Sequence, residues 1–210
     1  MLITTEITGQ VGSAGYLASG VTSAPRLSRR GGWQVSNAYR EAVEAGRCFA
    51  VCNQAGVTSQ AGLSATTPVL SLYNPASSGK NGFVHFAGAT FSVAFAAASA
   101  VWVAVNTDTA AAATTGTATT AHRNLKLGGG APALQPLLAA TLPAAPVAIS
   151  LLGIGLTGAI TTVPQIQTLG RWFDGGLIVA PGTTISFQTG TASGASGTFC
   201  ELIWEEQDAA

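Results

Sequence analysis

The segment LIVAPGTTISF at residues 177–187 constrains the fold of this chain more than any other stretch. Apolar and β-branched residues follow a period of two on both sides of Pro181 and Gly182, and this period predicts strands and argues against a helix. A Pro-Gly pair between two such runs marks a turn. We therefore predict two short strands joined at this pair, either as a hairpin or as a corner.

Further strand patterns recur along most of the chain, with turn residues between them. They cover residues 48–52, 69–73, 83–87, 90–96, 101–106, 147–153, 159–163 and 198–206, with a brief edge strand at 122–127. The last long pattern alternates Cys200, Leu202 and Trp204 with acids such as Glu201 and Glu205, which predicts one apolar face and one wet face. Short strands of this kind are typical of an all-β sandwich, and their order favours a single jelly roll.

Three segments depart from the strand pattern. Residues 36–46, SNAYREAVEAG, predict one short helix that Ser36 or Asn37 caps and Gly46 ends, the alternative being a long strand through this region. Residues 107–121 are low-complexity Ala and Thr and predict an exposed loop. Residues 128–146 are rich in Pro, Gly and Ala and predict a long loop with room for a helical turn.

Residues 1–35 predict an extended N-terminal arm, ahead of a single β-sandwich domain at residues 36–210. The arm is rich in Gly and Ser and shows no lasting period, but it holds Arg26, Arg29 and Arg30, three of the nine basic residues of the chain. With Trp33, these arginines are the residues that we expect to contact a partner subunit. The alternative is a solvated linker that its arginines keep soluble.

The chain is unusually poor in charge. Charged residues make up 9% of its 210 residues, against about a quarter in typical globular domains. A monomer in water normally carries a charged shell, so we expect another chain to cover much of this surface. The formal net charge is zero, which predicts no nucleic-acid partner. Glycines, serines and prolines interrupt the long uncharged stretches at 86–106 and 127–170, so we predict no membrane span.

No cluster of residues predicts an enzyme mechanism. The only histidines are His85, which alternates with apolar residues on a predicted strand, and His122, and no GxSxG segment is present. The acids Asp108, Asp174 and Glu201 have no spacing that pairs them across a groove. We therefore expect a protein that is not an enzyme and that has no cofactor.

The three cysteines, Cys48, Cys52 and Cys200, do not form a disulfide framework for a chain of this length. We expect them to be buried free thiols. No second Cys or His pair stands at zinc spacing, so we predict no metal site. Nothing in the cysteine pattern requires an oxidising compartment, and the first ten residues do not have the features of a secretory signal.

Three segments together resemble virion structural proteins of tailed bacteriophages. They are GRCFAVCNQAGVTSQAGLSATTPVLSLYNPASSGKNGFV at residues 46–84, GGLIVAPGTTISFQT at 175–189 and SGTFCELIWEEQ at 196–207. The resemblance covers most of residues 38–206, and its motifs are structural in kind. Neither the arm nor the proline-rich loop has a counterpart in it.

The resemblance implies a jelly-roll capsid decoration, or cement, protein. Such a protein is a homotrimer that binds the major capsid protein on the outer surface of the virion, after synthesis in the host cytoplasm. The alternative is a head-fibre, tail-fibre or spike component that binds a host receptor or glycan through exposed aromatic residues such as Tyr73, Trp172 or Phe173. A third hypothesis is a jelly-roll enzyme acting on host polysaccharide through Asp174 or Glu201.

Overall fold

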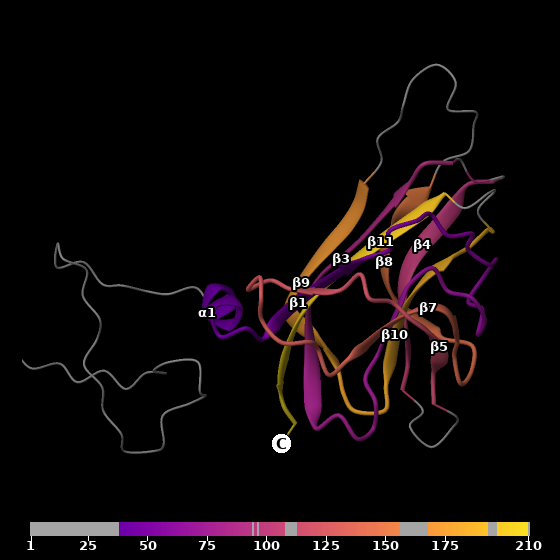
Figure 1. Ribbon diagram of the computed structural model, residues 1–210. Helices are drawn as coiled ribbons and strands as arrows, with labels where there is room; N and C mark the ends of the chain where they lie inside the picture. Colours follow the sequence, from indigo (N-terminus) through magenta and orange to yellow (C-terminus); the bar gives the residue numbers. More distant parts are fainter. Residues whose placement is uncertain are drawn as a thin grey trace, which may run out of the picture.

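The computed structural model describes residues 38–93, 95, 97–107, 113–155, 168–192 and 197–209, and in these the chain forms one short helix and two antiparallel sheets (Figure 1). The predicted arm at residues 1–35 and the predicted strand at 159–163 lie outside the described residues. No helix in the described part of the chain has the length and the apolar character needed to cross a bilayer.

The sheets have five and six strands. The first has the order β6-β1-β11-β3-β9 and the second the order β5-β7-β2-β10-β4-β8. The elements are α1 (Ala38–Glu44), β1 (Cys48–Cys52), β2 (Ser71–Tyr73), β3 (Lys80–Phe91), β4 (Ser99–Asn106), β5 (Thr115–Ala118), β6 (Arg123–Asn124), β7 (Gln135–Thr141), β8 (Val147–Gly155), β9 (Thr168–Val179), β10 (Thr184–Thr189) and β11 (Thr198–Asp208).

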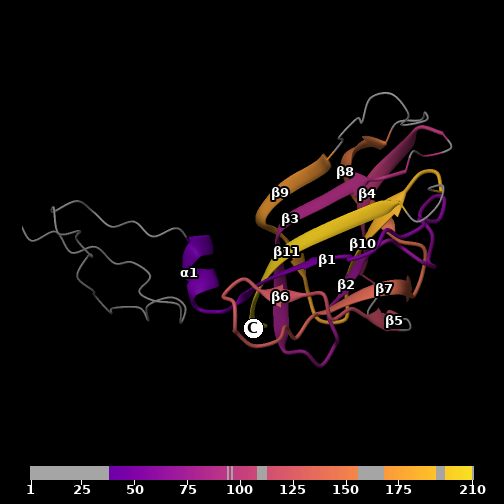
Figure 2. The same cartoon turned by 45° about the horizontal axis from the view of Figure 1, so that its top comes forward.

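The connections between strands define a jelly roll. From β1 to β4 the chain changes sheets at every connection. Strand β4 then pairs with β8 in the same sheet, and from β8 to β11 the chain again changes sheets at every connection. The core order β1-β11-β3-β9 therefore packs against β2-β10-β4-β8, the double Greek key of this fold. Figure 2 shows the first layer in front, with β11 running between β3 and β1. The predicted all-β, jelly-roll-like sandwich is confirmed.

The segment at residues 177–187 is a corner. Val179 ends β9 in the first sheet and Thr184 begins β10 in the second. Gly182 has a φ of 84°, a backbone conformation that residues with a Cβ rarely adopt. The amide of Thr183 donates to the carbonyl of Ala180, with 3.0 Å between N and O. The Pro-Gly turn thus carries the chain from one sheet to the other.

Other predicted elements agree with the structure in type but differ in extent. The helix α1 is present, and Gly46, with a φ of 74°, follows its end. The predicted strand at 83–87 lies within the long strand β3, but of the predicted strand at 90–96 only the first two residues belong to it. The predicted loops were wrong in part, because residues 107–121 contain β5 and residues 128–146 contain β7.

The two missed strands pair without the usual side-chain pattern. All four residues of β5 are exposed, so backbone pairing with β7 holds this strand while its side chains have no buried face. Within β7, Pro136 is buried opposite Leu72 of β2. Proline weakens a strand signal in a sequence, which is why this segment was predicted as a loop.

The hydrophobic core lies between the two sheets. It takes Phe49, Val84 and Trp204 from the first sheet and Leu72 and Phe187 from the second. Trp204 is fully buried, and its ring stacks on Phe49 with 5.7 Å between the ring centroids. Its position confirms the apolar face predicted for the last strand.

The last strand also differs from its prediction, because Glu206 is buried and shares the inner side with Trp204. Its carboxylate accepts hydrogen bonds from the backbone amides of Ala133 and Leu134 at 2.8 and 3.0 Å, and from the indole Nε1 of Trp204 at 3.1 Å. A buried carboxylate is tolerated where hydrogen bonds satisfy its oxygens. Glu206 therefore anchors the loop that leads into β7.

Two buried asparagines join the segments that carry the resemblance. Asn74, in the NPASSGKN turn, donates from Nδ2 to the carbonyls of Lys80 and Val179 at 2.6 and 2.8 Å. Asn53, in the NQA segment, accepts from the amide of Cys200 at 2.6 Å and donates to the carbonyl of Thr198 at 3.1 Å. Both side chains form hydrogen bonds with backbone groups at places where the hydrogen-bond ladder between two strands ends. The motifs are therefore structural.

We predict that Asn74→Ala lowers the free energy of unfolding by about 2–4 kcal/mol, because it removes the side-chain donor that the turn and the corner share, at the carbonyls of Lys80 and Val179. Chemical denaturation monitored by tryptophan fluorescence measures this change. Asn81→Ala is the control: Asn81 is only partly buried, and we expect a change within about 0.5 kcal/mol. Equal effects of the two substitutions would contradict this role of Asn74.

Candidate functional site

Strand β8 presents a row of large apolar side chains to the outside, which we call the β8 strip. The pairing of β8 with β4 shifts register twice along this row, between Val101 and Trp102 and between Val103 and Ala104 of β4. Leu151 is 54% exposed, and the other members are exposed to a similar degree. The β8 strip consists of Val147, Ile149, Leu151 and Ile154. Contiguous exposed apolar residues of this size mark interaction surfaces.

Strand β9, at the edge of the other sheet, also exposes an apolar side chain. Trp172 is 59% exposed, and its ring contacts Phe86 of β3 with 4.9 Å between the ring centroids. A hydrogen bond of 3.1 Å from Arg171 to the hydroxyl of Ser150 connects β9 with β8. The last strands of the two sheets are thus in contact, and both expose apolar side chains.

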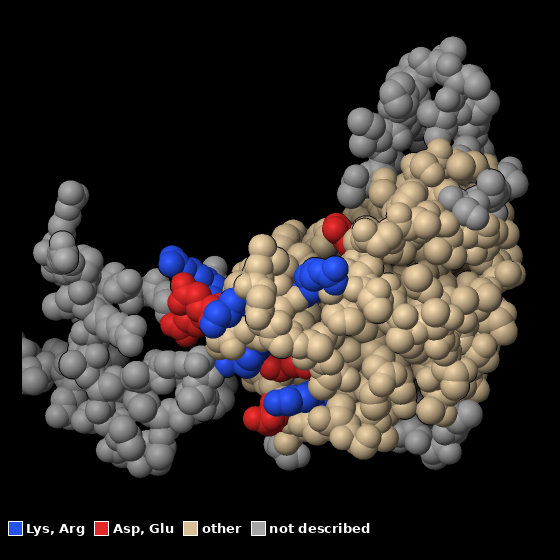
Figure 3. All heavy atoms as spheres, in the orientation of Figure 1, with Lys and Arg blue, Asp and Glu red and all other residues tan. Residues whose placement is uncertain are grey.

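Charged side chains gather elsewhere. Figure 3 shows most of them near α1 and the strand ends beside it, with further basic and acidic side chains toward the middle of this face, whereas the remaining surface in this view is free of charge. Two of the ion pairs join Arg40 with Glu44 in α1 and Lys80 with Asp208 at the end of β11. No charged residue occurs in β8, VAISLLGIG. Charge is thus concentrated near α1, with Arg171 and Asp174 also exposed on β9, whereas β8 itself is neutral.

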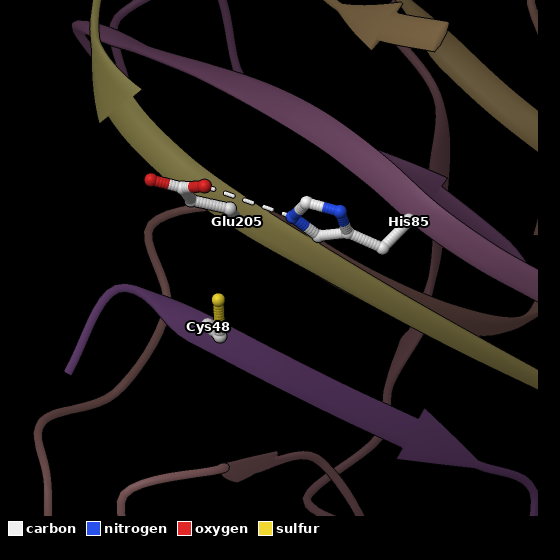
Figure 4. Close-up of side chains that lie close together, drawn as sticks. All are labelled: Cys48, His85 and Glu205. Carbon is white, nitrogen blue, oxygen red and sulfur yellow. Dashed lines mark ion pairs between the residues drawn. The ribbon is translucent and has the colours of Figure 1, made fainter. Parts of the chain in front are cut away.

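A second group of residues lies on the outer side of the first sheet, where it is buried. Cys48 of β1 is directly opposite Glu205 of β11, and His85 of β3 is on the other side of Glu205. The pairing of β3 with both of its neighbours shifts register at His85, which marks a β-bulge. A bulge re-aims a side chain, and here it brings His85 toward Glu205. Figure 4 shows the three side chains approaching one another from three strands.

Hydrogen bonds hold the carboxylate of Glu205 in place. Its Oε1 accepts from Nε of Arg47 at 3.0 Å, and Nη2 of the same guanidinium is 2.9 Å away. The amide of Gln207 donates to the same oxygen at 2.9 Å. Burial by itself raises the pKa of Glu205. The nearby His85, Gln207 and Arg47 favour the charged carboxylate and lower this pKa by more than burial raises it, so the pKa falls below its ordinary value.

This arrangement corrects the prediction of a wet face for β11. Glu201 is exposed as expected, but Glu205 is only 6% exposed. Helix α1 covers this position: its Tyr39 ring packs edge-on against His85 with 4.9 Å between the ring centroids, and Ala42 is fully buried. The amide of Arg47 donates to the carbonyl of Ala42 at 3.0 Å. Sequence alternation predicts the face of a strand, but it does not show that a helix covers that face.

The thiols in the described structure are all free, as predicted. Cys48 and Cys200 are buried, whereas Cys52 is half-buried, so the prediction of burial was wrong for Cys52 in part. Burial, followed by the negative charge of Glu205, raises the pKa of the Cys48 thiol to about 12 against the opposing effect of Arg47.

The residues that the sequence suggested for binding are widely distributed. Arg26, Arg29, Arg30 and Trp33 lie outside the described residues, as does Asp108. Of the three aromatic residues, Trp172 is exposed and Phe173 half-buried, but Tyr73 is buried, so its predicted role in ligand stacking was wrong. Asp174 and Glu201 are both exposed, on β9 and β11, and β3 lies between these strands.

The other histidine has a local structural role. Nδ1 of His122 lies 2.9 Å from the carbonyl oxygen of Thr119, within the turn before β6. Sequence reasoning singled out neither the β8 strip nor the buried group as a site. Exposed apolar residues on a strand look like core residues in a sequence, and the buried group becomes visible only once three strands are aligned.

Comparison of the chain with protein-family models, with curated proteins and with solved structures finds no match. The fold, the surfaces and the buried groups of the chain are therefore the basis for inferring its function.

We predict that Glu205→Gln lowers the free energy of unfolding by about 1–3 kcal/mol, because it replaces the charged hydrogen bonds between Glu205 and the partly buried Arg47 with weaker neutral ones. Thermal and urea unfolding measure this change. Glu201→Gln on the same strand is the control, and we expect it to alter stability by less than about 0.5 kcal/mol since its side chain is exposed. Equal stability of the two variants would contradict the structural importance of the buried carboxylate.

Proposed function

We propose that this chain is a non-enzymatic virion structural protein, a decoration or cement protein that stabilises a phage head by binding across capsomers as an oligomer. The jelly-roll fold fits the resemblance of residues 38–206 to such proteins. Fold alone does not imply function, so the proposal depends on the surface of the molecule.

The observation that carries the proposal is the uncharged β8 strip. A second copy of the chain fits it best, because a neutral apolar surface selects a neutral apolar partner and this chain is itself poor in charge. Homotrimers then form as the β8 strip of each copy packs against a neighbour. A cyclic arrangement closes the assembly and leaves no strip exposed.

The β8 strip offers enough apolar surface for association. Complete burial of a Val, Leu or Ile side chain contributes about 1.5–3 kcal/mol, and each member of the strip already has part of its surface buried. The four residues together therefore contribute several kcal/mol per interface, before the cost of association. Repeated contacts around a trimer and on a capsid add to this through multivalency.

The arm makes the second contact in this proposal. Arg26, Arg29 and Arg30, with Trp33, bind the major capsid protein or a neighbouring copy, and arginine suits an acidic patch because it forms paired hydrogen bonds with carboxylates. The protein is then located on the outer surface of the capsid. Burial of surface across capsomers resists expansion of the shell without any catalysis.

The alternative proposal is a head-fibre, tail-fibre or spike component that binds a receptor or glycan. The exposed ring of Trp172 on β9 favours it, because sugar rings stack on exposed aromatic side chains. A glycan array that gives reproducible binding, lost in Trp172→Ala and kept in Phe173→Ala, would support this alternative over the decoration protein.

Electron microscopy of the intact virion tests the proposed function directly. We expect density for this chain, in trimers, on the outside of the head at threefold or quasi-threefold positions. A location in the tail would overturn the decoration role. So would purified protein that stays monomeric, does not bind capsids and does not change their thermal stability.

We predict that Leu151→Lys converts the oligomer into monomers, because it places a charge in the β8 strip. Sedimentation equilibrium measures the mass. Leu127→Lys is the matched control, since Leu127 is 85% exposed and lies outside β8, and we expect this variant to remain oligomeric. Circular dichroism confirms that both variants fold. An oligomer that survives Leu151→Lys would show that copies meet at another surface.

A further inference from the structure

Three potential metal ligands meet on the outer face of the first sheet. Each of Cys48, His85 and Glu205 offers one ligand atom, and these atoms all lie within 4.8 Å of one another. They come from the adjacent strands β1, β3 and β11, and all three residues are buried. Strands in a paired sheet are rigid supports, which suits a site whose geometry must be held.

His85 supplies the observation that points to a ligand. The residue is 9% exposed, and its Nε2 is buried without a hydrogen-bond partner. The distance from this Nε2 to Oε2 of Glu205 is 3.6 Å, which is beyond normal hydrogen-bond distance. A buried polar atom without a partner costs free energy. In the close-up, the imidazole and the carboxylate face each other and the thiol of Cys48 points toward the space beside them (Figure 4).

The surroundings of Glu205 leave one of its oxygens available. Arg47 and Gln207 both bind Oε1, whereas Oε2 faces His85. Outer hydrogen bonds of this kind orient a carboxylate that binds a metal through one oxygen. Arg47 also balances the charge of Glu205, so the metal-free protein tolerates this carboxylate in a buried place.

We propose that Cys48, His85 and Glu205 bind a Zn²⁺ ion through Sγ, Nε2 and Oε2. Thiolate, imidazole and carboxylate are all zinc ligands, and three protein ligands leave a fourth position for water. Zinc bonds of about 2.0–2.3 Å place the ligand atoms of a tetrahedral site about 3.3–3.8 Å apart. The present separations therefore require shifts of about 1 Å, which side-chain rotation supplies.

Binding must release a proton from Cys48. Zinc binds cysteine as the thiolate, so the thiol must give up its proton. The S–H bond is replaced by a Zn–S bond and the proton goes to solvent, with no change in oxidation state. The ion then joins β1, β11 and β3 beneath α1, and it stabilises the folded chain because the unfolded chain does not hold these three ligands together. This site is independent of the proposed function on a capsid.

Cobalt(II) is the probe for this site, because it takes zinc positions and reports on them by absorption. We expect the metal-free, reduced wild-type protein to bind one Co²⁺ ion per chain, with a thiolate-to-metal charge-transfer band and the visible bands of tetrahedral cobalt, and we expect Zn²⁺ to displace it. We also expect Zn²⁺ to raise the unfolding temperature. Absence of these bands and of any thermal shift in the wild-type protein would overturn the proposal, whatever the variants do.

Matched variants locate the metal. We expect Cys48→Ser to abolish the charge-transfer band and to weaken Co²⁺ binding by at least about tenfold. Cys52→Ser, on the same strand and outside the cluster, should keep both. His85→Gln should lose the tetrahedral spectrum, whereas His122→Gln should keep it. A band that is lost in Cys52→Ser and kept in Cys48→Ser would overturn the assignment, and circular dichroism of each metal-free variant separates loss of binding from loss of fold.

Discussion

The structure depends on β11 more than on any other element. This strand is at the centre of the first sheet, between β1 and β3, and its Trp204 fills the core against the second sheet. The next two residues extend its role, because Glu205 organises the outer face and Glu206 satisfies the amides that lead into β7. Burial of a large aromatic ring provides the main stabilisation, and the adjacent carboxylates keep the neighbouring polar groups satisfied.

The distribution of charge connects the fold with the proposed function. Most of the ionic groups gather near α1 and the strand ends beside it, while β8 presents a row of exposed apolar side chains without charge. Solvent-exposed apolar surface of this kind is stable in an assembly, where another copy covers it. A structural role in a particle is consistent with this division, and so is the absence of charge along the whole of β8.

Side-chain pattern explains which parts of the fold could be predicted. Alternation around Trp204 and the Pro-Gly turn predicted the inner face of β11 and the corner between β9 and β10, because both are local consequences of backbone geometry. The exposed strand β5 and the proline-containing β7 could not be predicted, since their pairing relies on backbone hydrogen bonds from distant segments. Of the candidate site, the exposure of Trp172 was expected under the glycan-binding alternative, whereas the outward-facing residues of β8 were not recognisable, since exposed apolar residues on a strand look like core residues in a sequence.

The sequence by itself determined the all-β class, the jelly-roll order, the helix before the first strand and the shortage of charge, because period, turn residues and composition are local properties. Only the tertiary structure decided that Val147, Ile149, Leu151 and Ile154 face outward and that Tyr73 is buried. It alone brought Cys48, His85 and Glu205 together. The physical reason is that strand register, the bulge at His85 and the cover of α1 depend on pairing between residues far apart in the chain.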